Sequence, residues 1–367
     1  DDGNQDTTVT IAVDDDNSDN AFDGLADQTV TVTTIDNDAV GFTLSTTTAS
    51  VTEAGSTATF TVVLDSQPSS NVVLTVASAD TGEATVSPTP LTFTTGNWDS
   101  TQTVTVTGVD DSIDDGNQDT TVTIAVDDDN SDNAFDGLAD QTVTVTTIDN
   151  DAVGFTLSTT TASVTEAGST ATFTVVLDTQ PTSDVVLTVV SADTDEATVS
   201  PTPLTFTNGD WDTPQTVTVT GIDDSIDDGN QDTTITIAVD DDNSDNAFDG
   251  VADQTVTATT TDNDTAAYTL STTTASVTEA GSTATFTVVL DTQPLSDVVL
   301  TVVSADTGET TVSPATLTFT TANWDTTQTV TVTGVDDSID DDNQDTTVTI
   351  AVDDDNSDNT FDGVADQ

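Results

Sequence analysis

The chain of 367 residues contains no lysine, arginine, histidine or cysteine. Without cationic side chains it cannot contact nucleic-acid phosphates directly, and anionic membrane surfaces repel it. It also lacks an imidazole base, a thiolate or amine nucleophile, and the nitrogen and sulfur ligands that zinc, iron and copper prefer. No apolar run approaches the length of a membrane span. We therefore expect no enzyme, no nucleic-acid partner, no disulfide framework and no direct membrane insertion.

The charged residues are all acidic. The 68 aspartate and glutamate residues give a formal net charge of −68. High net charge is typical of disordered chains, but here Val, Leu, Ile and Phe recur in alternation with Thr. This alternation favours a folded chain, whose negative charge must be neutralised by something other than protein.

The sequence repeats itself at a spacing of 113 residues. The hexapeptide that begins at Asp1 recurs at Asp114 and Asp227 and, with one change, at Asp340. A period of this length is a whole domain. We place the domain boundaries after the Asp-Asn-Asp tripeptides, which gives four segments: 1–38, the C-terminal part of a truncated repeat; 39–151 and 152–264, two complete repeats; and 265–367, a repeat that lacks its last strand. Either this is a window from a longer array, or residues 1–38 supply the missing strand to a neighbouring chain.

Each repeat alternates polar and apolar residues with a period of two. In 57–65, Phe60, Val62 and Leu64 alternate with Thr59 and Thr61. Such alternation predicts half-buried β-strands. Seven short strands in about 113 residues predict an all-β fold of tandem immunoglobulin-like Greek-key β-sandwiches strung end to end. In the first complete repeat we expect strands at 41–52, 57–65, 71–78, 84–94, 101–109, 119–127 and 140–148.

The acidic residues gather in the predicted loops. Strands that run alternately up and down bring the ends of the first, third, fifth and seventh strands to one pole, which we call the exit pole. In the first complete repeat this pole collects Glu53, Asp80, Asp110, Asp111, Asp114, Asp115, Asp149 and Asp151. The counterparts of Asp80 in the later repeats are Asp193 and Asp306. The opposite pole carries a second acidic loop at 127–133.

Converging carboxylates need a cation or protons. Two carboxylates about 4 Å apart repel each other by about 4 kcal/mol at an effective dielectric constant near 20. Several such pairs approach the roughly 5–15 kcal/mol by which a whole domain is stable. Oxygen ligands in flexible loops suit Ca²⁺ best. The alternative is a solvated acidic surface of the kind found in halophilic proteins, but such a surface would place Asp along the strands, where this sequence has Thr.

Three motifs of the first complete repeat resemble the Calx-beta family of calcium-binding β-sandwiches: Val51–Gly55, Thr105–Asp115 and Val145–Asp151. The resemblance implies calcium ligands at Glu53, Asp110, Asp111, Asp115, Asp149 and Asp151. In the second repeat it implies Glu166, Asp223, Asp224, Asp228, Asp262 and Asp264. In the third it implies Glu279, Asp336, Asp337 and Asp341, and in the first 38 residues Asp2, Asp36 and Asp38. Gln118 stands where the family often has a further acid, so the number of ions at this pole stays open.

These observations lead to a structural hypothesis. We expect a calcium-stabilised, extracellular or cell-surface stalk or filament segment of a repetitive bacterial surface protein, with calcium and other copies of itself as partners. An alternative is an adhesin that stacks glycans on Trp98, Trp211 and Trp324, although these residues are also suited to covering one end of the core. A calcium sensor is a third alternative, but a sensor rarely needs several matching copies.

Overall fold

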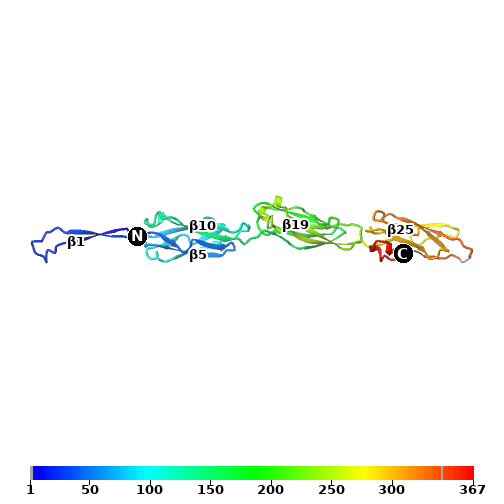
Figure 1. Cartoon of the computed structure of the whole chain (residues 1–367), viewed down its shortest axis with the longest axis horizontal. Helices are drawn as coiled ribbons and strands as arrows, with labels where there is room; N and C mark the ends of the chain where they lie inside the picture. Colours follow the sequence, from blue (N-terminus) through cyan, green and yellow to red (C-terminus); the bar gives the residue numbers. More distant parts are fainter. Residues whose placement is uncertain (1–2, 340–341) are drawn as a thin grey trace. The chain divides into compact units, whose positions relative to one another are not determined.

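The computed structural model describes residues 3–339 and 342–367 of the chain. It divides into two compact units, Asp1–Ala152 and Val153–Gln367, and each is described by itself (Figure 1). The described residues contain β-strands and a few 3₁₀ turns of three residues each. The expected all-β class is therefore confirmed.

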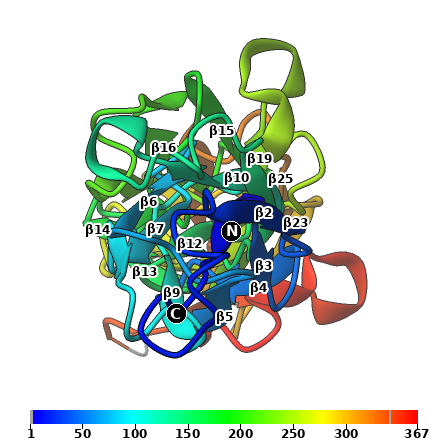
Figure 2. The same ribbon diagram turned by 90° about the vertical axis from the view of Figure 1, so that its left-hand side faces the viewer.

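The first unit contains a two-sheet β-sandwich. Viewed from its end, β6 and β10 lie on one side and β5 and β9 on the other (Figure 2). One sheet has the order β3 (Phe42–Leu44), β5 (Thr57–Leu64), β9 (Gln102–Gly108), β7 (Ala84–Ser87). The other has the order β4 (Thr48–Thr52), β11 (Gln141–Ile148), β10 (Gln118–Val126), β6 (Val72–Ser78), β8 (Leu91–Phe93), and η1 (Asp128–Asn130) follows β10.

The alternation seen in the sequence builds the core of this sandwich. Phe60, Val62 and Leu64 of β5 are buried, as are Val104 and Val106 of the neighbouring β9. The threonines between them face outward because successive side chains of a strand point to opposite faces. The predicted β-sandwich is therefore confirmed.

Two of the expected strands are each divided between the two sheets. Residues 41–52 form β3 and β4, because Ser45 and Thr46 leave the ladder and the Thr46 hydroxyl donates to the carbonyl oxygen of Thr48 at 2.9 Å. Hydroxyl side chains that bond to nearby backbone favour turns over strands. Residues 84–94 form β7 and β8, which are separated by Pro88 and Pro90. Proline has no backbone N–H to donate to a β-ladder. β7 therefore ends at Ser87, and the chain crosses to the other sheet, where β8 begins at Leu91.

The second unit begins with a sandwich of the same topology. Its strands are β12 (Phe155–Leu157), β13 (Thr161–Thr165), β14 (Thr170–Leu177), β15 (Val185–Ser191), β16 (Ala197–Ser200), β17 (Leu204–Phe206), β18 (Gln215–Gly221), β19 (Gln231–Val239) and β20 (Gln254–Thr261). The turns η2 (Asp241–Asn243) and η3 (Asn246–Phe248) lie between β19 and β20.

The third sandwich has a four-stranded sheet like those of the other two sandwiches and a smaller, three-stranded sheet. Among the described residues it has no counterpart of β11 or β20. Its elements are β21 (Tyr268–Leu270), β22 (Thr283–Leu290), β23 (Val298–Ser304), β24 (Thr310–Ser313), β25 (Thr316–Phe319), β26 (Gln328–Gly334), β27 (Val348–Val352), η4 (Asp354–Asn356) and η5 (Asn359–Phe361).

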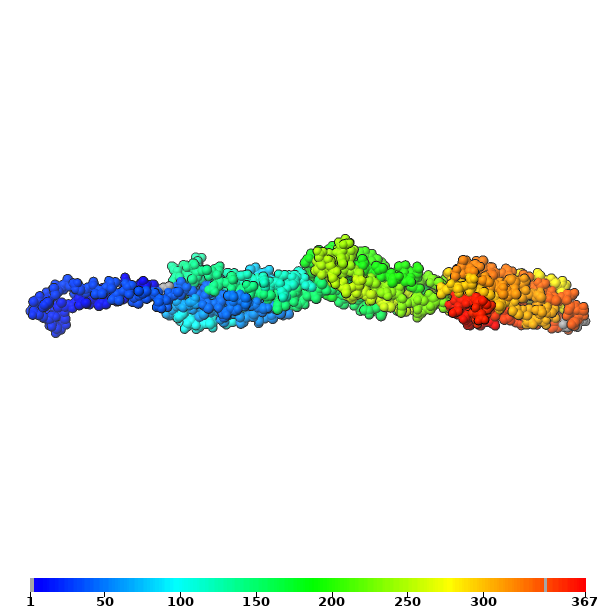
Figure 3. Space-filling view, in the orientation of Figure 1, coloured from blue at the N-terminus to red at the C-terminus, as the bar shows by residue number. Residues whose placement is uncertain are grey.

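Residues 3–38 of the first unit form a separate hairpin of β1 (Gln5–Ile11) and β2 (Gln28–Thr34). Every residue of both strands is exposed. Figure 3 shows the hairpin as the narrow, dark-blue part of the first unit. Its valines therefore lie in solvent, although the same residues of β10 and β11 are buried in the first sandwich.

Candidate metal centre

The turn after β4 holds the Glu53 side chain inside the protein. The Gly55 amide donates to the Thr52 carbonyl oxygen at 3.2 Å, and the Thr52 amide donates to the Ser56 hydroxyl at 2.7 Å. Gly55 has a φ of +79°, which favours glycine at this turn. Gly108 packs directly under the turn, because a Cβ built there would lie 2.1 Å from the Thr52 carbonyl oxygen. Glu53 is only 1% exposed as a result.

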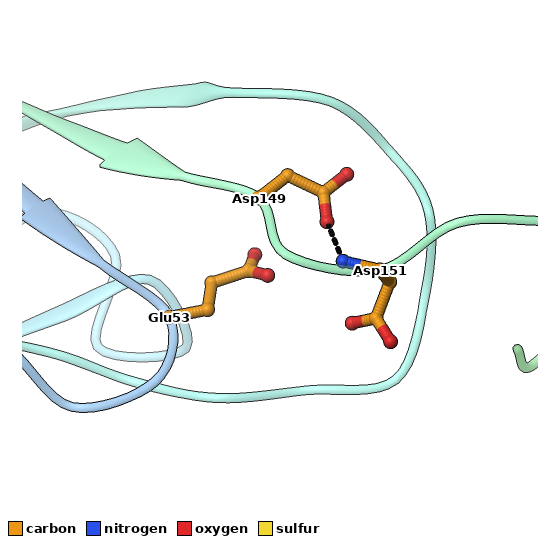
Figure 4. Close-up of side chains that lie close together, drawn as sticks. All are labelled: Glu53, Asp149 and Asp151. Carbon is orange, nitrogen blue, oxygen red and sulfur yellow. Dashed lines mark hydrogen bonds between the residues drawn. The ribbon is translucent and has the colours of Figure 1, made fainter.

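A parallel strand pair brings Glu53 beside the end of β11. Thr52 is the partner of Ile148, and the Glu53 amide donates to the Ile148 carbonyl oxygen at 3.1 Å. Asp149 follows immediately. One of its carboxylate oxygens accepts from the Asp151 amide at 2.7 Å, as Figure 4 shows. The other accepts from the Gly116 amide at 2.7 Å, so the Asp149 carboxylate is fixed in position.

Glu53, Asp149 and Asp151 form what we call the carboxylate cluster (Figure 4). Each contributes an oxygen atom, and these three atoms all lie within 4.8 Å of one another. Calcium binds oxygen at about 2.3–2.6 Å, so two ligand oxygens of one ion lie at most about 5 Å apart. The cluster therefore has the size of a calcium site.

Two buried carboxylate oxygens at this end of the sandwich have no hydrogen-bond partner among the described residues: Oδ2 of Asp151 and Oε2 of Glu83. A buried oxygen of this kind is unfavourable unless a donor or a cation satisfies it. The chain has no cationic side chain to do so. The residues present therefore fit a bound metal ion.

The electrostatics of the carboxylate cluster also favour a bound cation. Burial, followed by the charges of Asp149, Asp111 and Glu83, raises the pKa of Glu53 to about 7. Burial also raises the pKa of Asp151, with the charges of Asp149, Asp110 and Asp111 adding to it. Without a cation, these carboxyl groups oppose one another's ionisation.

Glu83 belongs to this end of the sandwich, although we did not predict it as a ligand. Burial raises its pKa, and so do the charges of Asp115, Asp111 and Asp80. The sequence does contain a pattern that could have identified Glu83 as a candidate. Only six acids of the chain are glutamates, two in each of the last three repeats, and Glu53 and Glu83 are the pair in the first of these.

The second sandwich repeats the arrangement with Glu166, Asp262 and Asp264, whose oxygens again lie within 4.8 Å of one another. The backbone amide of Asn263 donates to Glu166 at 3.0 Å, and its side-chain amide donates to the same oxygen at 3.2 Å. Burial raises the pKa values of Glu166 and Asp264. Burial and the charges of nearby acids, among them Asp228, Asp224 and Asp193, raise the pKa of Glu196, the counterpart of Glu83, to about 7.

Other predicted ligands hold their own loops, and those of the first two sandwiches also lie near the clusters. Asp80, Asp193 and Asp306 each accept a backbone amide two residues further on, at 2.9, 3.0 and 2.8 Å. Asp111, Asp224 and Asp337 accept the amide of the following isoleucine, at 2.8, 2.7 and 2.7 Å. The charge of Asp110 acts on Asp151 of the carboxylate cluster, and that of Asp115 acts on the neighbouring Glu83. In the second sandwich, Asp223 acts on Asp264 and Asp228 acts on Glu196 in the same way.

The remaining predicted ligands are not brought into a cluster among the described residues. Asp36 and Asp38 repeat the local contact of Asp149 and Asp151, with the Asp38 amide 2.9 Å from Asp36, but on the exposed hairpin. Glu279 is exposed, and Asp336 and Asp337 lie in the same sandwich. Asp2 and Asp341 lie outside the described residues.

At the opposite pole, an aspartate has a structural role. Asp132 is buried and accepts the amides of Ser69, Ser70 and Ala134 and the Ser69 hydroxyl, at 2.6–3.1 Å. Burial alone would raise its pKa, but these hydrogen bonds hold it below the usual value.

Trp98, Trp211 and Trp324 are half-buried and pack against the cores of their sandwiches, so the described structure favours the core role over glycan stacking.

No helix in the described part of the chain has the length and apolar character needed to cross a membrane.

No curated protein matches the chain in sequence. Among solved structures, the chain is similar to the calcium binding domain CBD12 of CALX1.1, with 15% identity over 54% of this chain and 80% of that one and a TM-score of 0.26. It is also similar to domains 4 and 5 of the S-layer protein SbsC, with 22% identity over 51% and 70% of the two chains and a TM-score of 0.27. The family described as Calx-beta domain matches residues 36–151, 149–264 and 261–366.

Proposed function

Because the chain belongs to the Calx-beta domain family, we propose that the carboxylate cluster of each complete sandwich binds Ca²⁺. The observation that carries this proposal is the buried Glu53 beside Asp149 and Asp151, together with the unpartnered buried oxygen of Asp151. Glu53, Asp149 and Asp151 would hold the ion, and Glu83, Asp110 and Asp111 would complete its surroundings. The ion would supply the positive charge that no side chain of this protein can supply.

Calcium suits this set of donors better than magnesium does. All the donors are oxygens on loops and strand ends, and several are carboxylates. Calcium accepts six to eight such ligands in flexible geometry, whereas magnesium keeps several waters and usually binds only one or two carboxylates. We therefore propose calcium as the resident ion.

The consequence of binding is mechanical. Asp149 and Asp151 lie where the first repeat leads into the second, and the parallel pair β4–β11 ends at the same point. An ion held there would tie the end of β11 to the turn at Glu53 and so stabilise this end of the sandwich. We propose that the protein is a structural, calcium-stabilised segment of a stalk or filament, with no catalytic role.

We place this segment outside the cell or on its surface. Extracellular modules bind calcium with dissociation constants of about 10⁻⁴–10⁻³ M, which match the high calcium concentration outside cells. Near-identical copies serve length and stiffness rather than separate chemistry, which is typical of a spacer in a repetitive bacterial surface protein. Self-association into fibres is part of the same proposal.

Thermal melting in excess calcium and in excess EGTA tests the calcium-binding role. At a free calcium concentration 100 times the dissociation constant, one site adds about 2.7 kcal/mol. For domains of this size, that corresponds to a midpoint higher by roughly 10–15 °C. Equal midpoints in the two buffers would overturn the proposal.

Two matched double variants test whether the calcium-dependent gain in stability arises at the carboxylate cluster. Asp110→Asn with Asp111→Asn should remove most of the calcium-dependent gain of the first sandwich, because both charges act on the carboxylate cluster. Asp128→Asn with Asp129→Asn removes the same charge from exposed positions in η1. This control should keep the gain. A loss of equal size in both variants would indicate a general effect of charge rather than a site.

A further inference from the structure

The carboxylate clusters of the first two sandwiches differ in one contact, although both include an Asp-Asn-Asp tripeptide. The central residue is Asn150 in the first and Asn263 in the second. Asn263 donates its side-chain amide to Oε2 of Glu166 at 3.2 Å and to Oδ1 of Asp223 at 3.1 Å. Among the described residues, the only hydrogen bond that Asn150 donates comes from its backbone amide, to Oε2 of Glu53 at 3.3 Å.

The two sandwiches also differ in how their buried carboxylate oxygens are satisfied. In the first, Oδ2 of Asp151 and Oε2 of Glu83 are buried and have no partner. Among the described residues, neither of their counterparts, Oδ2 of Asp264 and Oε2 of Glu196, is buried without a partner. The second sandwich therefore shows less unmet need for a donor or a cation.

The Asn263 amide nitrogen links two parts of the second sandwich. Glu166 belongs to the turn after β13, and Asp223 belongs to the loop after β18. A hydrogen bond to a carboxylate is roughly twice as strong as one between neutral groups. In a chain without lysine, arginine or histidine, only the side-chain amides of Asn and Gln have two N–H groups to share between two carboxylates.

The loop does not need this side-chain contact to keep its shape. In both tripeptides, 149–151 and 262–264, the amide of the second aspartate donates to the first aspartate at 2.7 Å. The other oxygen of the first aspartate accepts a glycine amide, that of Gly116 or Gly229, also at 2.7 Å in both. The backbone contacts are thus the same with and without the side-chain bridge. The bridge therefore acts on the carboxylates rather than on the fold of the loop.

We propose that the Asn263 side chain stands in for a cation in the second sandwich when calcium is absent. Its amide bridges Glu166 and Asp223 and so stabilises the calcium-free sandwich. Calcium must displace this amide to use the same oxygens, so Asn263 lowers the calcium affinity of the second cluster. The proposal rests on the calcium-binding function given above and adds a residue that sets the affinity.

Urea denaturation of the full chain tests the proposal, with a single tryptophan as the reporter of the second sandwich. Trp98→Phe with Trp324→Phe leaves Trp211, which packs against the second core. Unfolding is followed by its fluorescence in EGTA and at a series of free calcium concentrations. The rise in the free energy of unfolding with calcium gives the apparent dissociation constant.

Asn263→Ala removes the bridge and keeps the backbone amide that donates to Glu166. Asn263 is exposed, so the sandwich should still fold. In EGTA we expect the urea midpoint to fall by roughly 0.5–1 M. The apparent dissociation constant for calcium should fall about tenfold, which corresponds to about 1.4 kcal/mol. This is the size of one hydrogen bond to a charged group.

Saturating calcium separates a stand-in for the cation from an ordinary structural contact. If calcium displaces the amide, its loss costs nothing once calcium is bound. The midpoints of Asn263→Ala and of the parent should then be equal in saturating calcium, although they differ in EGTA. A structural contact would lower the midpoint of the variant in both buffers.

Two further variants serve as controls. Asn150→Ala, studied in a chain that keeps only Trp98, changes the same residue of the matching loop where the side chain makes no bridge. It should leave both the midpoint in EGTA and the calcium affinity of the first sandwich unchanged. Asn263→Asp keeps the size of the side chain but has no N–H to donate. Its midpoint in EGTA should fall at least as far as that of Asn263→Ala, because lost packing is not the cause.

The outcomes separate this proposal from the calcium-binding proposal. An unchanged midpoint of Asn263→Ala in EGTA, or an equal fall in EGTA and in saturating calcium, overturns the stand-in. Weaker calcium binding by Asn263→Ala also overturns it, because the side chain would then assist the ion. If neither parent chain responds to calcium, the calcium-binding proposal fails. A fall in EGTA that is confined to the Asn263 variants would still support the bridge between the two carboxylates.

Discussion

In the absence of calcium, raising the pH should destabilise the first sandwich. Its buried Glu53 has a pKa of about 7, against an ordinary value of 4.5, because of burial and the charges of Asp149 and Asp111. Between these two values the folded state keeps a proton that the unfolded state has released, so the stability conferred at low pH is lost as the pH rises. The difference corresponds to roughly 3 kcal/mol.

Neighbouring groups do not reverse the sign of this effect. The pKa values of Asp151 and Glu83 are also raised, so their ionisation adds to the loss. The pKa of Asp132 is lowered, so its contribution is lost only as the pH falls below its ordinary value of 3.8. Between about pH 5 and pH 8 that contribution is constant.

Urea denaturation in EGTA at about pH 5 and about pH 8 measures this difference. Trp211→Phe with Trp324→Phe leaves Trp98, which packs against the first core, as the fluorescent reporter. We expect the free energy of unfolding to fall by roughly 3 kcal/mol between the two pH values. Glu53→Gln cannot ionise and should show a smaller fall, and excess calcium should remove the fall altogether. An equal free energy at both pH values in EGTA, or an equal fall in Glu53→Gln, would refute the reasoning.

Three further substitutions test the backbone around the sites by chemical denaturation. Gly108→Ala should destabilise the first sandwich by more than about 2 kcal/mol and weaken calcium binding, because its Cβ would meet the Thr52 carbonyl oxygen at 2.1 Å; Gly96→Ala has its nearest neighbour at 4.0 Å and should be neutral. Asp132→Ala should cost about 1–3 kcal/mol, because the amides of Ser69 and Ala134 lose their charged acceptor. Asp342→Gly should stabilise the third sandwich by roughly 1 kcal/mol, because Asp342 has a φ of +65°. A change of the opposite sign in any of them would count against the local geometry described above.

The sandwich architecture could be predicted because its determinants are local. The alternation of Val104 and Val106 with threonines specifies one buried and one exposed face. The 113-residue repeat then carries the prediction from one domain to the next. The Calx-beta resemblance rested on loop motifs and is confirmed by the family match over residues 36–151, 149–264 and 261–366.

The division of strands between sheets was harder to predict. Residues 42–52 contain no glycine or proline to mark a break, and the change of sheet depends on hydroxyl contacts at Ser45 and Thr46. The parallel pairing of β4 with β11 joins segments almost a whole domain apart. Tertiary pairing of this kind has no local sequence signal.

The geometry of the candidate site could likewise be predicted only in part from the sequence. Strand order placed Glu53, Asp149 and Asp151 at one pole, but only the parallel pair explains why they lie within 4.8 Å of one another. Glu83 was missed because its approach depends on the fold of the turn before β7. Asp80 accepts the Gly82 amide within its own turn and also raises the pKa of Glu83 through its charge, and both effects depend on backbone geometry that composition does not reveal.

Crystallography in calcium, with anomalous scattering recorded, tests the central claim most directly. We predict an anomalous peak in the first sandwich at about 2.3–2.6 Å from oxygens of Glu53, Asp149 and Asp151, and a second peak in the cluster of Glu166. An ordered sandwich in saturating calcium, with no peak at either cluster and the carboxyl groups hydrogen-bonded directly to one another, would contradict the account.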